Sequence, residues 1–129
     1  MEGKAKTGCQ RKLRVLVDYK GSCLIEDNGL HDDWLALNLK EDAAVENLAT
    51  AILNFPVIDG EKVLFIHDLI SNEGEEEKDL LMDVVIRFAV KRGYRYIYIY
   101  SVRHSREYLV SREFTLLSQG GLAVRKLNL

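Results

Sequence analysis

The chain has 129 residues, of which 47% are hydrophobic and 29% are charged, so it is long enough for one domain with its own core. Its formal net charge of −2 argues against general binding to nucleic acid or to anionic membranes. Two cysteines are too few for a disulfide framework or a zinc site, no apolar run approaches ~18 residues, and the beginning lacks an apolar leader, so we expect a cytoplasmic protein with reduced thiols.

The first third of the chain is predicted to be mostly strand. Residues 1–11 are polar and are expected to form a flexible tail. Residues 13–19 alternate between apolar and polar side chains and predict a strand, with residues 23–27 as its partner in a hairpin. Residues 34–39 predict a third strand.

The middle of the chain changes its apolar period. Residues 41–54 carry apolar side chains at helical spacing, so we predict a helix there, ended by Pro56. Residues 63–70 (VLFIHDLI) are an almost continuous apolar run, which is typical of a central strand that is covered on both faces.

The clearest element is a helix over residues 75–92. Its apolar positions recur at three- and four-residue spacing, at Leu80, Leu81, Val84, Val85 and Phe88. Asn72 is predicted to cap the N-terminus, and Glu75 three residues later completes a pair similar to a capping box. Gly93 follows as the expected left-handed stop.

The last part of the chain returns to strand. Residues 94–100 alternate tyrosine with other side chains and predict a strand whose tyrosines pack against helices. A short helix is predicted over residues 105–113, followed by a closing hairpin of residues 114–118 and 122–129. Because a helix joins them, the strands at 63–70 and 94–100 are expected to be parallel, with a right-handed crossover.

These elements predict a single α/β domain over residues 1–129. Its order is β-β-β-α-β-α-β-α-β-β, and the hairpins at both ends should be antiparallel. The expected architecture is therefore a central mixed sheet flanked by helices.

From Val63 onward the order of elements resembles the Gcn5-related N-acetyltransferase (GNAT) family. The segments VLFIHDLIS, RGYRYIYIYS and REYLVSREF, together with the long helix and the closing hairpin, carry the resemblance over about residues 63–129. In that family a central strand leads through a phosphate-binding loop into a long helix, and the cofactor is acetyl-coenzyme A. The resemblance implies that a cofactor would be contacted by Leu69, Ile70, Ser71, Gly74 and Lys78.

The cofactor loop departs from the family pattern. The family carries Gln/Arg-x-x-Gly-x-Gly/Ala, whose backbone amides and helix N-terminus receive a pyrophosphate. The matching positions here are Glu73, Glu76 and Lys78, and three consecutive carboxylates would face the anion. The sequence therefore predicts a degenerate acetyl-CoA site with no cofactor, in a protein that acts through a protein partner or self-association, with no nucleic acid and no membrane.

An active enzyme is the alternative. Aligning residues 113–114 with the family's Gly-Phe pair places Leu109 at the position of its general-acid tyrosine, and a shift of one residue would place Tyr108 there. His67 lies near the C-terminal end of the central strand, where open α/β sheets bind ligands, and Asp68 is expected on the opposite face. The alternative is thus an acetyl-CoA-dependent N-acyltransferase that uses His67 or Tyr108 in proton transfer.

Three further features carry weaker expectations. The run His31-Asp32-Asp33 would bind a metal only with distant partners, so a turn is favoured and no metal is predicted. His104 follows the tyrosine-rich strand and faces the same crevice as His67. An unrelated mixed α/β fold stays open, and full pairing of the strands at 63–70 and 94–102 would favour it.

Overall fold

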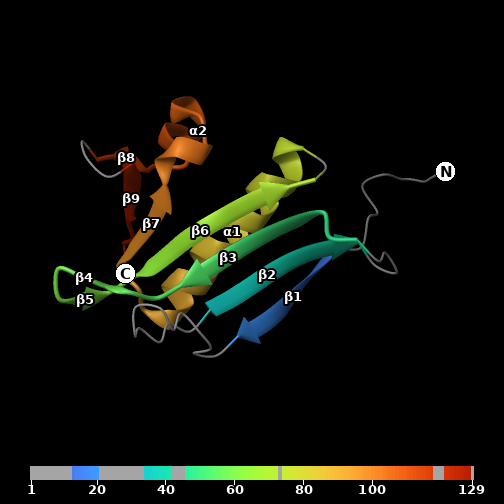
Figure 1. Cartoon of the computed structure of the whole chain (residues 1–129), viewed down its shortest axis with the longest axis horizontal. Helices are drawn as coiled ribbons and strands as arrows, with labels where there is room; N and C mark the ends of the chain where they lie inside the picture. Colours follow the sequence, from blue (N-terminus) through green and yellow to red (C-terminus); the bar gives the residue numbers. More distant parts are fainter. Residues whose placement is uncertain (1–12, 21–33, 42–45, 73, 118–120, 129) are drawn as a thin grey trace, which may run out of the picture.

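A computed structural model describes residues 13–20, 34–41, 46–72, 74–117 and 121–128 (Figure 1). The strands are β1 (Leu13–Lys20), β2 (Trp34–Glu41), β3 (Ala49–Asn54), β4 (Val57–Ile58), β5 (Glu61–Lys62), β6 (Leu64–Ser71), β7 (Tyr96–Tyr100), β8 (Thr115–Leu116) and β9 (Leu122–Lys126). The helices are α1 (Glu75–Arg92), a 3-10 turn η3 (Ser101–Arg103) and α2 (Arg106–Ser111). The predicted tail, the predicted strand at 23–27 and the run at 31–33 lie outside the described residues.

Seven strands form one mixed sheet in the order β1-β2-β3-β6-β7-β9-β8. The strands from β1 to β6 pair antiparallel with their neighbours, β6 pairs parallel with β7, and β9 pairs antiparallel with β7 and β8. The predicted α/β class and the parallel β6-α1-β7 unit are confirmed. β4 and β5 form a separate hairpin at the Asp59-Gly60 turn.

The predicted helix over residues 41–54 is wrong where the structure describes it. Residues 49–54 form β3, which lies between β2 and β6 and pairs with both. The buried side chains Ala49, Ala51 and Leu53 repeat every second residue, as a strand requires, although their apolar neighbours also fit a helical period. Pairing on both edges decides the conformation because it satisfies the backbone groups of β3 on each side.

α1 has the predicted range, but not the predicted N-cap. Gly74 is the N-cap residue and no side chain caps the first turn, while the Asn72 side chain donates instead to the Asn47 carbonyl at 3.0 Å. At the other end Gly93 adopts φ 83 and ends the helix as predicted. Three glutamates in the first turn and Lys91 near the last turn complement the helix dipole.

The core lies between α1 and one face of the sheet. It is a single cluster that joins α1 to β2, β3, β6, β7 and α2; its fully buried larger side chains include Leu37, Leu53, Leu64, Ile66, Leu81, Met82, Val85, Ile97, Ile99 and Leu109. In β7 the isoleucines therefore face the core. The half-buried tyrosines at 96, 98 and 100 point to the other face, so the prediction that they pack against helices is wrong.

Within the described ranges, neither the length nor the apolar character of any helix suffices to cross a lipid bilayer.

Candidate functional site

The central parallel strands, β6 and β7, diverge. They pair at Leu64 with Ile97, Phe65 with Tyr98 and Ile66 with Ile99, and the pairing ends there although β6 continues to Ser71. Figure 1 shows the two strands separating toward their C-terminal ends, with α2 beyond the end of β7. In open α/β sheets, ligands usually bind at the C-terminal ends of strands that separate in this way. The gap between β6 and β7 is therefore the first candidate for a site.

A β-bulge lies at His67 in β6. Ile66 pairs with Leu53 and Asp68 pairs with Ile52, so His67 is the extra residue in its strand. Because Ile66 and Leu53 face the core, the bulge places both His67 and Asp68 toward the face away from α1. The prediction that these two side chains point to opposite faces is therefore wrong.

His67 lies in a cluster of aromatic rings on that face. Its ring centroid is 4.6 Å from Trp34, 4.9 Å from Phe65 and 5.5 Å from Tyr100. Tyr98 extends the cluster by stacking on Phe65 at 6.3 Å. The rings around His67 therefore come from β2, β6 and β7, and they pack the imidazole among aromatic side chains.

Asp68 closes the gap between the diverging strands by an ion pair with Arg103 of η3. The Arg103 side chain is 61% exposed and the Asp68 side chain is 31% exposed, so the pair lies at the surface. A pair of this kind contributes on the order of 0–1 kcal/mol to stability. Its main effect is to hold η3 beside the end of β6.

The loop between β6 and α1 is closed on itself. The Ser71 hydroxyl donates to the Gly74 carbonyl at 2.6 Å and accepts from the Gly74 amide at 3.0 Å. Glu75 and Glu76 follow with exposed side chains at the start of α1. The first residues of the helix therefore present carboxylates, and the Gly74 amide is already bonded within the loop.

Lys78 points inward from this first turn, toward α2. Its ammonium lies 4.1 Å from the centroid of the Tyr108 ring, and its side chain is only 13% exposed. Glu75 is its partner at 3.9 Å on the outer side. The His104 ring stacks on Tyr108 with the ring centroids 5.9 Å apart. Lys78, Tyr108 and His104 therefore form a cluster where α1 meets α2.

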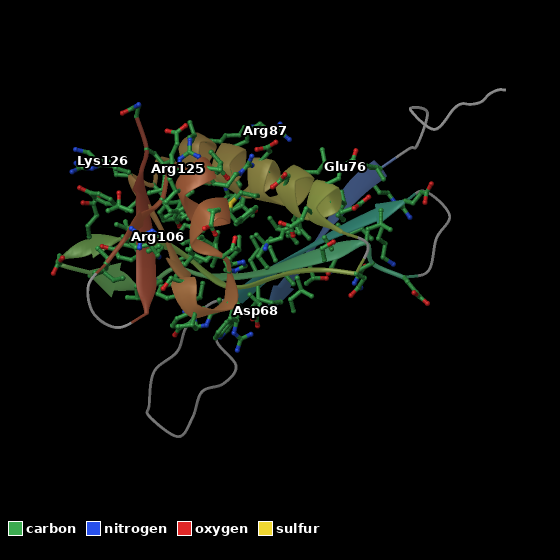
Figure 2. The ribbon with its side chains drawn as sticks, turned by 90° about the horizontal axis from the view of Figure 1, so that it is seen from above. Asp68, Glu76, Arg87, Arg106, Arg125 and Lys126 are labelled. Atoms are coloured by element: carbon green, nitrogen blue, oxygen red, sulfur yellow. The ribbon has the colours of Figure 1, made fainter. Side chains whose placement is uncertain are left out.

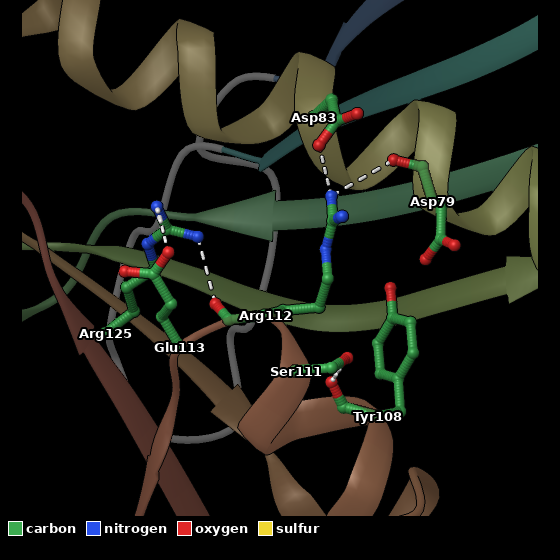
Figure 3. A network of polar contacts seen from close by, with 7 residues as sticks. All are labelled: Asp79, Asp83, Tyr108, Ser111, Arg112, Glu113 and Arg125. Atoms are coloured by element: carbon green, nitrogen blue, oxygen red, sulfur yellow. Dashed lines mark hydrogen bonds and ion pairs between the residues drawn. The ribbon is translucent and has the colours of Figure 1, made fainter.

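The Tyr108 hydroxyl points toward the Asp79 carboxylate without reaching hydrogen-bond geometry (Figure 3). Arg112 crosses from the end of α2 to α1, where it donates to the Asp79 carbonyl at 3.3 Å and to the Asp83 carboxylate. In the described part of the chain, the Tyr108 hydroxyl, Asp79 Oδ1, His104 Nδ1 and Arg112 Nε are buried without a hydrogen-bond partner. Four such atoms therefore lie close together where α2 packs against α1, and buried polar atoms without a partner call for an explanation.

The protonation states at this junction are set mainly by burial. Burial raises the pKa of the Tyr108 phenol above its ordinary value of 10, and the nearby Asp79 carboxylate raises it further. Burial lowers the pKa of His104 to about 4, with Lys78 and Arg103 acting in the same direction and Asp68 against it. At neutral pH Tyr108 is therefore a proton donor and His104 is an uncharged acceptor.

The cofactor residues implied by the family resemblance do not form one open surface. Leu69 is buried in the core, while Ile70 is 51% exposed. Ser71 and Gly74 bond to each other, and Lys78 is directed at Tyr108. The loop still leads from β6 into α1, but Ser71 and Gly74 in it hydrogen-bond to each other.

The two predicted catalytic side chains, His67 and Tyr108, belong to two different clusters. His67 belongs to the ring cluster of β2, β6 and β7, and Tyr108 belongs to the α1–α2 junction. His104, which the sequence placed near the crevice, is the histidine that the structure brings beside Tyr108. The sequence did not predict a role for Asp79 or Arg112. The four-residue spacing of Asp79 and Asp83 places both on one face of the helix and was the available signal. Their partner, Arg112, is about thirty residues away in the chain.

Among the side chains that the structure describes, no three His, Cys, Asp or Glu residues converge as a metal site would require. Comparison of the sequence with protein-family models and with curated proteins finds no match.

Proposed function

We propose that this chain is a GNAT-like domain with a degenerate acetyl-CoA site, which is non-catalytic and acts through contacts with protein chains. The resemblance is to a family in which three antiparallel strands run directly into the cofactor strand. The antiparallel order β1-β2-β3-β6 supports the resemblance, since the segment first expected to interrupt the strands as a helix is β3.

Two details of the C-terminal half support the resemblance. The limited pairing of β6 with β7 disfavours the alternative in which these strands pair along their whole length. At the end of α2, Glu113 adopts φ 67, a conformation that favours glycine, at the position where the family's Gly-Phe pair has glycine. The amides of Glu113 and Phe114 bond to the carbonyls of Val110 and Leu109 in the usual helix-ending pattern.

The exposed carboxylates at the start of α1 support a degenerate cofactor site. Glu75 and Glu76 are exposed at the helix end that would receive the pyrophosphate, and Lys78 is turned away toward Tyr108. Two like charges 4 Å apart repel by about 1 kcal/mol in water and about 4 kcal/mol near a protein surface. A multiply charged anion would meet this repulsion from more than one carboxylate.

The contact surface that we propose is the edge of β1, and its partner is a second copy of the chain. Among the strands that the structure describes, β1 lies at the end of the sheet; it has eight residues, and Leu16 and Val17 on it are 39% and 57% exposed. An edge strand with unpaired backbone groups and apolar side chains is a template for pairing with another chain. Two copies related by a two-fold axis would join their sheets through β1.

Sedimentation velocity over a range of protein concentrations tests this contact. We expect a monomer–dimer equilibrium in the unmodified chain and a shift toward monomer in Val17→Lys, because a charge would be buried at the new strand pair. Val102→Lys is the matched control, since Val102 is 78% exposed on η3 and away from β1. A monomer at all concentrations, or equal effects of the two variants, would contradict the β1 contact.

An active N-acyltransferase remains the second candidate because the junction pairs a proton donor with an acceptor. In that case His104 would take a proton from the attacking amine, the amine nitrogen would bond to the acyl carbon as the carbon–sulfur bond breaks, and Tyr108 would protonate the departing thiolate. We expect Tyr108→Phe to abolish any acetyl transfer to amines. Transfer at the unmodified rate in that variant would exclude this role of Tyr108.

A further inference from the structure

A pocket lies on the outer side of Arg112, between α1 and the end of α2. Its volume is about 340 Å³, at the lower end of the range for small-molecule sites. Asp83 and Arg87 line it from α1, and Arg125 lines it from β9. Figure 2 shows Arg87 on α1 and Arg125 on β9 on the same side of the molecule. The pocket is distinct from the β6–β7 gap and from the loop that precedes α1.

Two of the arginines in the lining are held in place by the protein. Arg112 donates to the Asp83 carboxylate and to the Asp79 carbonyl, and Arg125 donates to the Arg112 carbonyl at 2.9 Å (Figure 3). Arg125 also lies 4.0 Å from the Glu113 carboxylate, and both arginine side chains are only 20% exposed. Guanidinium groups fixed in this way lose little conformational entropy when a ligand binds.

Arg87 contributes a positive charge that no carboxylate of the pocket lining pairs with. It has no ion pair among the described residues, whereas Arg112 and Arg125 each have a carboxylate beside them. The charged groups of the lining are therefore three arginines against Asp83 and Glu113, which leaves one positive charge. We propose that this pocket binds the carboxylate of a small organic monoanion, with Arg87 as its main charge partner.

The same groups define the class of ligand. A phosphate monoester carries more negative charge and would be repelled by the Asp83 and Glu113 carboxylates at the rim, whereas a carboxylate matches the single unbalanced charge. Ile86 contributes an apolar wall, so the carboxylate should carry a hydrocarbon body. This site does not depend on the proposed function of the domain.

Benzoate and benzamide are a suitable pair of probes because they share a shape and differ in charge. We expect benzoate to shift the side-chain Nε–Hε signals of Arg87 and Arg125 in ¹H–¹⁵N NMR spectra at constant ionic strength. Benzamide and inorganic phosphate should bind more weakly. N-acetyl-trialanine, which ends in a peptide carboxylate, is titrated in parallel; tighter binding of this peptide would support the carboxylate site and assign it to a polypeptide C-terminus.

Arg87→Gln is the decisive variant, since Arg87 is exposed and makes no hydrogen bond among the described residues whose loss would unfold the chain. We expect it to weaken benzoate binding at least about threefold, as for a partly screened ion pair. Lys91→Gln removes the same charge one turn along α1 outside the pocket and should leave the affinity unchanged. Equal binding of benzamide, tighter binding of phosphate, equal loss in both variants, or no shift with benzoate would overturn the proposal.

Discussion

The half-buried position of His104 makes the stability of the domain depend on pH. The folded chain holds the pKa of His104 at about 4, against an ordinary value of 6.5, because burial and the nearby cations Lys78 and Arg103 disfavour the charged ring. Between these two values the unfolded chain binds a proton that the folded chain does not. The free energy of unfolding should therefore be constant in this respect above pH 6.5 and should fall as the pH decreases toward 4.

The size of the effect follows from the same difference. A tenfold difference in proton affinity is worth about 1.4 kcal/mol, so the complete effect would be about 3 kcal/mol. The ring is only half-buried, and solvent screening reduces this to about 1–2 kcal/mol. A loss of that size is a sizeable fraction of the usual stability of a small domain, which is about 5–15 kcal/mol.

Urea unfolding followed by the fluorescence of Trp34, the only tryptophan, measures this dependence at several pH values between 7 and 4.5. His104→Gln cannot titrate, so the difference in unfolding free energy between it and the unmodified chain isolates the histidine from the acidic residues. An equal pH dependence with and without His104 would refute the reasoning.

Three further predictions concern stability, each measured by urea unfolding at pH 7. Glu113→Gly should stabilise the chain by about 0.5–1 kcal/mol because it relieves the left-handed φ of 67, whereas Glu113→Ala should not stabilise it; a loss in the glycine variant would contradict the strain. Leu109→Tyr should destabilise the chain by about 1–3 kcal/mol because Leu109 is fully buried and the larger tyrosine side chain would overpack the core. A neutral effect would show that α2 can shift. Asp83→Asn should cost about 1 kcal/mol by weakening the Arg112 contact between the helices, and a double-mutant cycle with Arg112→Gln should give a coupling of similar size; zero coupling would show that the contact is not formed in solution.

The strongest periodic patterns predicted the structure well. α1 has the predicted range because its apolar spacing, charged ends and Gly93 agree with one another. The parallel strands on either side followed from the helix between them. The segment at 41–54 failed because its apolar side chains fit two periods at once, and pairing of β3 with both neighbours is a long-range property that no local pattern contains.

The candidate site was only partly predictable for the same reason. Tyr108 could be singled out on α2, and His104 could be placed near the crevice. The β-bulge that brings Asp68 to the same face as His67 depends on the register with β3, which the sequence does not determine locally. The contact of Arg112 with Asp83 joins residues 29 apart in the chain, and it arises only when α2 packs against α1.

Calorimetric titration of acetyl-coenzyme A into the unmodified chain tests the central proposal most directly. Because Glu75 and Glu76 expose their carboxylates at the start of α1 and Lys78 is turned toward Tyr108, we expect no saturable heat at ligand concentrations up to about 1 mM, the weak limit of specific binding. Saturable binding with a micromolar Kd would contradict the degenerate site and favour an active acyltransferase.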